Sequence, residues 1–147
     1  MFGMRLTLHT DYALRTLLYL AHTGRPAPVD AIATAYAISR EHLVKVVQTL
    51  TRLGYVSTRA GRGGGVSLAR DPAKVKVSQV VADVEGRQQV LDCVLRPQVC
   101  PLEPGCGLRR LLMQAEDAFY AALADTSIAD LAHPKARKGG IHNLALT

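Results

Sequence analysis

The chain has 147 residues, 48% of them apolar, and a formal net charge of +6. This length suits one compact domain, and the composition excludes a disordered chain. Its apolar runs are short and interrupted by charges, and its N-terminus lacks an apolar leader. We therefore expect no membrane span, no secretory signal and a cytoplasmic location, where thiols stay reduced.

Three amphipathic helices are predicted in the first part of the chain. Residues 11–23 form the first, with Thr10 as N-cap and an apolar face at Leu14, Leu17, Leu18 and Ala21. The second carries apolar residues at helical spacing at Val29, Ile32, Ala33 and Tyr36. The third follows after a very short turn, is capped by Ser39, and buries Leu43, Val46, Val47 and Leu50. Two helices joined so closely predict a helix-turn-helix.

The next segment, YVSTRAGRGGGVSLAR, predicts two short strands around a glycine-rich tip, which is the wing of a winged helix. A helix capped by Ser78 and closed at Gly86 follows, then a long amphipathic helix over 108–125 and one further turn. The apolar stripe of the long helix exceeds what one small domain needs, so we expect it to pair with the same helix of a second subunit.

The expected fold class is therefore mostly α with a small β-hairpin wing. We assign residues 4–72 to a winged helix-turn-helix DNA-binding domain and 73–107 to a connecting helix and cysteine loop. Residues 108–132 form the dimerisation helix, and 133–147 a mobile basic tail.

Charge and motif together indicate DNA as the partner. Residues 1–72 hold 9 Lys and Arg against 4 Asp and Glu, whereas residues 73–147 hold 9 against 8. The second helix of such a motif enters the major groove, so its outward residues are candidates for base and phosphate contacts. These are Ser39, Arg40, Glu41, His42, Lys45, Gln48 and Arg52. In the wing, Arg59 and Arg62 are candidates for the minor groove.

All three cysteines lie in CVLRPQVCPLEPGC, residues 93–106. Their C-x6-C-x5-C spacing matches neither the close pairs of zinc sites nor the usual ferredoxin pattern. Three thiolates on a proline-rich loop can hold one soft metal centre if a fourth ligand comes from elsewhere. Spacing alone leaves open three ordinary cysteines without a ligand.

Several stretches together resemble the NsrR/IscR superfamily of iron–sulfur winged-helix regulators, and its NsrR branch in particular. They are MRLTLHTDYALR, ISREHLVKVVQTLTRLGYV, GRGGGVSLAR and the three cysteines before the long helix, within residues 4 to about 130. The resemblance implies a homodimeric transcriptional repressor that senses nitric oxide through its cluster and binds a near-palindromic operator in double-stranded DNA.

The resemblance also implies the ligands, namely Cys93, Cys100 and Cys106, with Asp11 of the partner subunit as the fourth. An acidic residue in the first turn also suits the helix dipole, and His9 is a nearby rival ligand. The family's interval between the first two cysteines is a residue or so shorter. Such a ligand set holds 4Fe-4S or 2Fe-2S, of which we favour 4Fe-4S.

Other functions are retained as alternatives. The same fold can use the cysteines as a zinc site or as a thiol redox switch, or can bind a small molecule without a metal. The GRGGG loop lacks the lysine and hydroxyl residue of a P-loop, and we find no catalytic motif, so we expect no enzyme.

Overall fold

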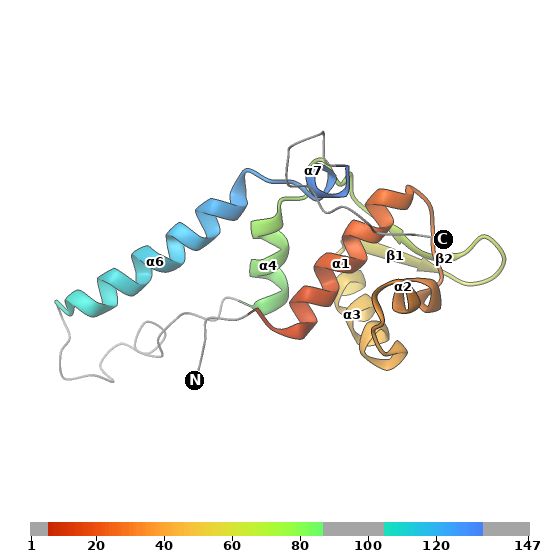
Figure 1. Cartoon of the computed structure of the whole chain (residues 1–147), viewed down its shortest axis with the longest axis horizontal. Helices are drawn as coiled ribbons and strands as arrows, with labels where there is room; N and C mark the ends of the chain where they lie inside the picture. The colour runs from red at the N-terminus through yellow and green to blue at the C-terminus, as the bar shows by residue number, and fades with distance from the viewer. Residues whose placement is uncertain (1–5, 87–104, 134–147) are drawn as a thin grey trace.

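The computed structural model describes residues 6–86 and 105–133 (Figure 1). In chain order its elements are α1 (Leu8–Thr23), α2 (Val29–Tyr36), α3 (Arg40–Arg52), β1 (Val56–Arg59), β2 (Gly65–Leu68), α4 (Val77–Glu85), α6 (Gly107–Ala124) and α7 (Ile128–Ala132). The expected fold class, mostly α with one two-stranded hairpin, is confirmed. Cys93, Cys100 and the predicted tail beyond residue 133 lie outside the described residues. None of the described helices combines the length and apolar character needed to cross a bilayer.

The first helix begins three residues before the predicted start. Thr7, not Thr10, is the N-cap, and its side chain accepts a hydrogen bond from the Thr10 backbone N–H. Thr10 is fully buried inside the helix. Of the predicted apolar face, Leu17 and Ala21 are buried, whereas Leu14 and Leu18 are half-buried, and Ala13 and Leu20 also belong to the described core.

The helix-turn-helix is confirmed, and its second helix buries the predicted face. Leu43, Val46, Val47 and Leu50 are each at most 5% exposed. Helix α2 ends at Tyr36, and its C-cap Ala37 has a left-handed backbone (φ 52°). The N-cap of α3 is Ser39, whose side chain accepts a hydrogen bond from the His42 backbone N–H. This N-cap was predicted because serine satisfies one of the free N–H groups at a helix start.

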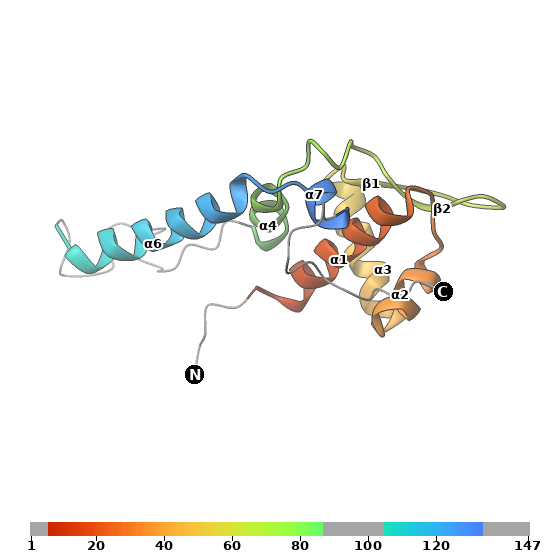
Figure 2. The ribbon, with the colours of Figure 1, turned by 45° about the horizontal axis from the view of Figure 1, so that its top comes forward.

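The wing is an antiparallel hairpin that is also fastened to the connection between α1 and α2. Val56 pairs with Leu68 and Arg59 with Gly65. Ala27 forms a further bridge to Val66, with N···O distances of 2.9 and 2.8 Å in the two directions. Figures 1 and 2 show the hairpin projecting beyond the helices on the side opposite α6.

Helix α4 packs on α1, and its start is set by a distant segment. It begins at Val77, so Ser78 is not the N-cap as predicted. Val77 is buried, and its backbone N–H donates to the Thr126 carbonyl at 3.0 Å. The Tyr55 hydroxyl, at the foot of the hairpin, donates to Asp83 of α4 at 2.6 Å. Burial and this bond raise the pKa of Tyr55 above its ordinary value.

The last short helix, α7, packs against α1. Helix α7 has a capping box between Ser127 and Asp130, and Ile128 is 1% exposed. The rings of His22 and His133 stack with centroids 5.7 Å apart. His22 Nδ1 lies 3.1 Å from the Ala132 carbonyl oxygen, and His133 Nε2 lies 3.1 Å from the Ala21 carbonyl oxygen. These contacts tie the end of α7 to the end of α1.

Candidate functional site

The predicted DNA-contacting residues all lie on exposed surface. On α3 they run from the N-cap along one side of the helix, and in the wing they lie at the end of β1 and in the tip. The exposed set is Ser39, Arg40, Glu41, His42, Lys45, Gln48, Arg52, Arg59 and Arg62. The opposite side of α3 is buried, so these side chains are the ones that α3 offers to a partner. Their individual roles remain predictions.

Two of the wing glycines are required by the fold of the wing itself. A Cβ on Gly64 would lie 2.3 Å from the Arg59 carbonyl oxygen, and one on Gly65 would lie 2.6 Å from the Ala27 carbonyl oxygen. Gly61 and Gly63, nearer the tip, have positive φ, and a Cβ added at either would have no neighbouring atom within 4 Å. The glycine run therefore serves internal packing at its C-terminal end and turn geometry at its tip.

Helix α1 contacts α3, the recognition helix of the helix-turn-helix, through a side-chain hydrogen bond that no sequence pattern predicted. His9 Nε2 lies 3.0 Å from Thr49 Oγ1, and the Thr49 hydroxyl donates to the Lys45 carbonyl. The His9 ring donates to the Thr49 oxygen or accepts from its hydroxyl, depending on which tautomer of His9 is present. Because the two residues are forty positions apart, no local spacing predicts this contact.

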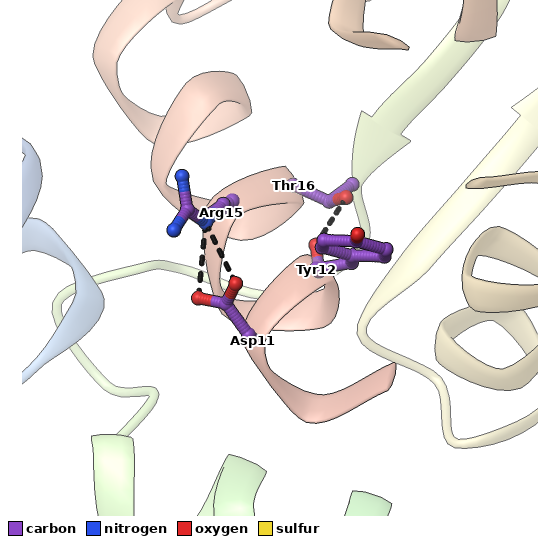
Figure 3. Close-up of polar contacts among 4 residues, drawn as sticks. All are labelled: Asp11, Tyr12, Arg15 and Thr16. Atoms are coloured by element: carbon purple, nitrogen blue, oxygen red, sulfur yellow. Dashed lines mark hydrogen bonds and ion pairs between the residues drawn. The ribbon is translucent and has the colours of Figure 1, made fainter. Parts of the chain in front are cut away.

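The predicted fourth ligand, Asp11, is held by an arginine one turn along α1 (Figure 3). Both carboxylate oxygens accept from Arg15 Nε, at 2.9 and 3.0 Å. The bond to Asp11 raises the pKa of the Arg15 guanidinium, so the arginine is charged at any physiological pH. The sequence could have predicted this ion pair, because an acidic and a basic residue four positions apart lie on the same face of a helix.

The described cysteine, Cys106, has a free thiol of intermediate exposure at the N-cap of α6. It makes no side-chain cap hydrogen bond. A free, accessible thiol is the donor that an iron–sulfur cluster needs. Within residues 6–86 and 105–133, no three His, Cys, Asp or Glu side chains converge as a metal site. Cys106 and Asp11 are not brought together within one chain, because Figure 1 shows the start of α6 far from α1.

The start of α1 is also hydrogen-bonded to the end of α4. The Thr7 backbone N–H and hydroxyl donate to Glu85 Oε1 at 2.7 and 3.0 Å. Burial alone would raise the pKa of Glu85, but hydrogen bonds from Thr10 and Thr7 outweigh it and hold the pKa below its ordinary value of 4.5.

We expect Glu85→Gln to lower stability near pH 7 by less than about 1 kcal/mol, because the carboxylate is largely solvated. A group whose pKa is depressed by folding stabilises above its unfolded value, and that contribution is lost as pH falls through the folded value. In urea unfolding across pH, the difference between wild type and variant should therefore shrink as pH falls below 4.5 toward the lower pKa of folded Glu85. A difference that does not shrink in acid would contradict this account.

Three helices, a hairpin wing and an exposed basic recognition face define a winged-helix DNA-binding protein. Residues 6–134 match the Rrf2 family, described as iron-dependent transcriptional regulators, and the chain belongs to this family. It is 38% identical over 135 residues to the HTH-type transcriptional regulator NsrR of Bacillus subtilis, covering 90% of this chain and 92% of that protein. It is 40% identical over 131 residues to the HTH-type transcriptional repressor NsrR of Streptomyces coelicolor, covering 87% and 88%. The resemblance to NsrR-type regulators is thereby confirmed, and the chain is a DNA-binding transcriptional repressor.

Solved structures share the fold at low sequence identity. CymR, described as the global cysteine regulator of B. subtilis, superposes with a TM-score of 0.74 at 23% identity, covering 88% of this chain and 97% of that one. IscR of T. potens gives 0.74 at 19% identity, with 96% and 94% covered. These likenesses confirm the winged-helix architecture.

Proposed function

We propose that this repressor carries an iron–sulfur cluster, 4Fe-4S in preference to 2Fe-2S, and senses nitric oxide by cluster nitrosylation or loss, which releases operator DNA. The observation that carries the proposal is the free thiol of Cys106 at the start of α6, in a segment that holds both other cysteines. The family's description as iron-dependent regulators supports it.

Cys93, Cys100 and Cys106 would hold the cluster, with Asp11 of the partner subunit completing the set. When bound, the cluster supplies iron that reacts with nitric oxide, most readily at a site with an oxygen ligand. Asp11 is partly exposed and its carboxylate is already oriented by Arg15, so it can serve a partner chain without refolding of α1.

Helix α1 is the part of this chain that would pass the signal to DNA. It touches α3 through the His9–Thr49 bond and α4 through the Thr7–Glu85 bonds. If Asp11 joins two subunits, releasing it frees α1 and the recognition helix to shift together. Operator half-sites have a fixed spacing, so a small displacement of two recognition helices weakens many contacts at once.

Replacing Asp11 by alanine is expected to shorten the lifetime of the cluster in air or to change its rate of reaction with nitric oxide, because one ligand is lost. The visible absorbance of anaerobically prepared protein measures both. Asp117→Ala, which removes an exposed carboxylate of α6, is the matched control and should behave as wild type. If Asp11→Ala matches wild type in both measurements, Asp11 is not the ligand.

We also propose that α6 forms a two-fold dimer, because it carries two apolar faces. Phe119, Tyr120 and Leu123 pack against the described core, whereas no residue of α6 is fully buried. Leu108 and Leu111 are 59% and 61% exposed, and they continue into an exposed stripe of Ala115, Ala118 and Ala122. A two-fold dimer suits a near-palindromic operator.

Leu111→Lys should weaken self-association by roughly a hundredfold, because the change occurs twice in a symmetric interface and each copy loses about one buried leucine. Sedimentation equilibrium measures the dissociation constant. Asp117→Lys, on the polar side of α6, is the control and should leave it unchanged. Equal dissociation constants for the two variants would exclude this face as the interface.

The decisive experiment is an anaerobic titration with nitric oxide that follows the visible spectrum and operator binding in the same sample. The two signals should change in parallel. If the spectrum changes while binding does not, cluster-gated repression is wrong. A colourless protein that contains zinc and no acid-labile sulfide would instead support the zinc alternative. A protein that contains neither metal nor sulfide would support the thiol redox switch.

A further inference from the structure

The two helices of the helix-turn-helix are joined by an ion pair on their exposed side. Arg40, the first residue of α3, donates from Nε to Asp30 Oδ1 of α2 at 2.8 Å. Both side chains are mostly exposed, at 68% for Arg40 and 71% for Asp30. Neither residue is a neighbour of the other in sequence or on one helix, so the fold itself creates this pair.

Holding the fold together is a poor explanation for the pair. Exposed ion pairs contribute little to stability, and α2 and α3 are already joined by buried side chains such as Ile32 and Leu43. Asp30 also lies in the first turn of α2, where a negative charge favours the helix dipole. That role does not require Arg40. A helix-dipole role and a role that depends on the contact with Arg40 therefore predict different behaviour of Asp30 variants.

A carboxylate beside a DNA-reading helix has an electrostatic cost, because it repels the phosphates of every sequence alike. The benefit that can offset this cost is orientation. With Nε committed to Asp30, the guanidinium loses its freedom to turn toward the nearest phosphate, while both Nη amino groups remain to donate. Paired arginine donors match guanine O6 and N7 in the major groove. The N-terminal end of α3, where Arg40 lies, is the end that faces base edges.

We propose that Asp30 is a specificity-determining positioning residue, which orients Arg40 to read one guanine in each operator half-site. Asp30 itself does not contact DNA. Its removal should therefore relax sequence preference at a single position while strengthening binding to unrelated DNA. The proposal rests on DNA binding by α3 and is independent of the cluster, so a failure of nitric oxide sensing leaves it standing.

The test selects preferred duplexes from a randomised pool with the full-length, anaerobically prepared protein, and repeats the selection with variants. Arg40→Ala should lose a guanine preference at one position per half-site, and Asp30→Ala should lose the same preference. Against a duplex substituted at that guanine, wild type should discriminate by roughly tenfold or more and Asp30→Ala by about threefold or less. Asp30→Asn, which keeps an acceptor for Nε, should retain an intermediate preference.

Asp117→Asn, with the same change in charge on α6, is the control and should leave every position unchanged. Circular dichroism and thermal unfolding of each variant confirm that α2 and α3 still form. The proposal is overturned if Asp30→Ala binds all duplexes more tightly but keeps the wild-type guanine preference, since Asp30 would then be only a repelling charge. It is equally overturned if Arg40→Ala loses no preference, or if the wild-type protein selects no sequence.

Discussion

Replacing Cys106 by serine is expected to remove bound iron and sulfide from anaerobically prepared protein without weakening α6. Serine is the closest analogue of cysteine in shape, but its hydroxyl stays protonated near neutral pH and is a poor ligand for the soft iron of a cluster. Cys106 is the N-cap of α6 and makes no side-chain cap bond there. Serine is a preferred N-cap, so the apo form should be equally stable or more stable by up to about 1 kcal/mol.

Chemical analysis of iron and sulfide, together with thermal unfolding of the apo proteins, separates the two effects. Met113→Ser places the same side chain at another partly exposed position of α6 and should keep the cluster. Loss of cluster in Cys106→Ser with an unchanged apo Tm would support ligation by this thiol. Full iron and sulfide content in the variant would exclude Cys106 as a ligand.

Replacing Gly65 by alanine is expected to lower the free energy of unfolding by roughly 2–5 kcal/mol, combining backbone strain with overpacking. Gly65 has φ +119°, a conformation that residues with a Cβ rarely adopt. The new Cβ would also lie 2.6 Å from the Ala27 carbonyl oxygen and 2.7 Å from its carbon. Since Ala27 pairs with Val66, relieving this clash separates the wing from the connection between α1 and α2.

Gly63→Ala is the matched control for the wing. Gly63 has φ +71° but no atom within 4 Å of the added Cβ, so only the left-handed backbone penalty of about 1–2 kcal/mol applies. Urea unfolding measures both variants, and DNA binding should fall further in Gly65→Ala because the arginines of the wing lose their position. Equal destabilisation of the two variants would show that the contact with Ala27 is not tight.

Sequence patterns predicted the helix-turn-helix well because its determinants are local. The apolar spacing from Leu43 to Leu50 and the serine cap at Ser39 both depend on residues within one turn of each other. The Asp11–Arg15 pair follows from the same helical spacing. Family resemblance then supplied the proposed function, which periodicity alone does not give.

The features that the sequence patterns predicted wrongly or missed depend on contacts between residues far apart along the chain. Helix α1 starts at Leu8 because Thr7 is fixed by Glu85, and α4 starts at Val77 because its N–H is bonded to Thr126. The His9–Thr49 and Asp30–Arg40 contacts join separate helices. No local pattern encodes such contacts, since they exist only after the helices have packed.

The Ala27–Val66 bridge has a consequence for how such regulators diversify. It joins the wing to the helices that carry α3, so the two parts predicted to contact DNA keep one relative orientation. The cysteine segment enters the chain at a different place, between α4 and α6. Changes of length or sequence in the cysteine segment can therefore leave the relative orientation of the wing and α3 unaltered.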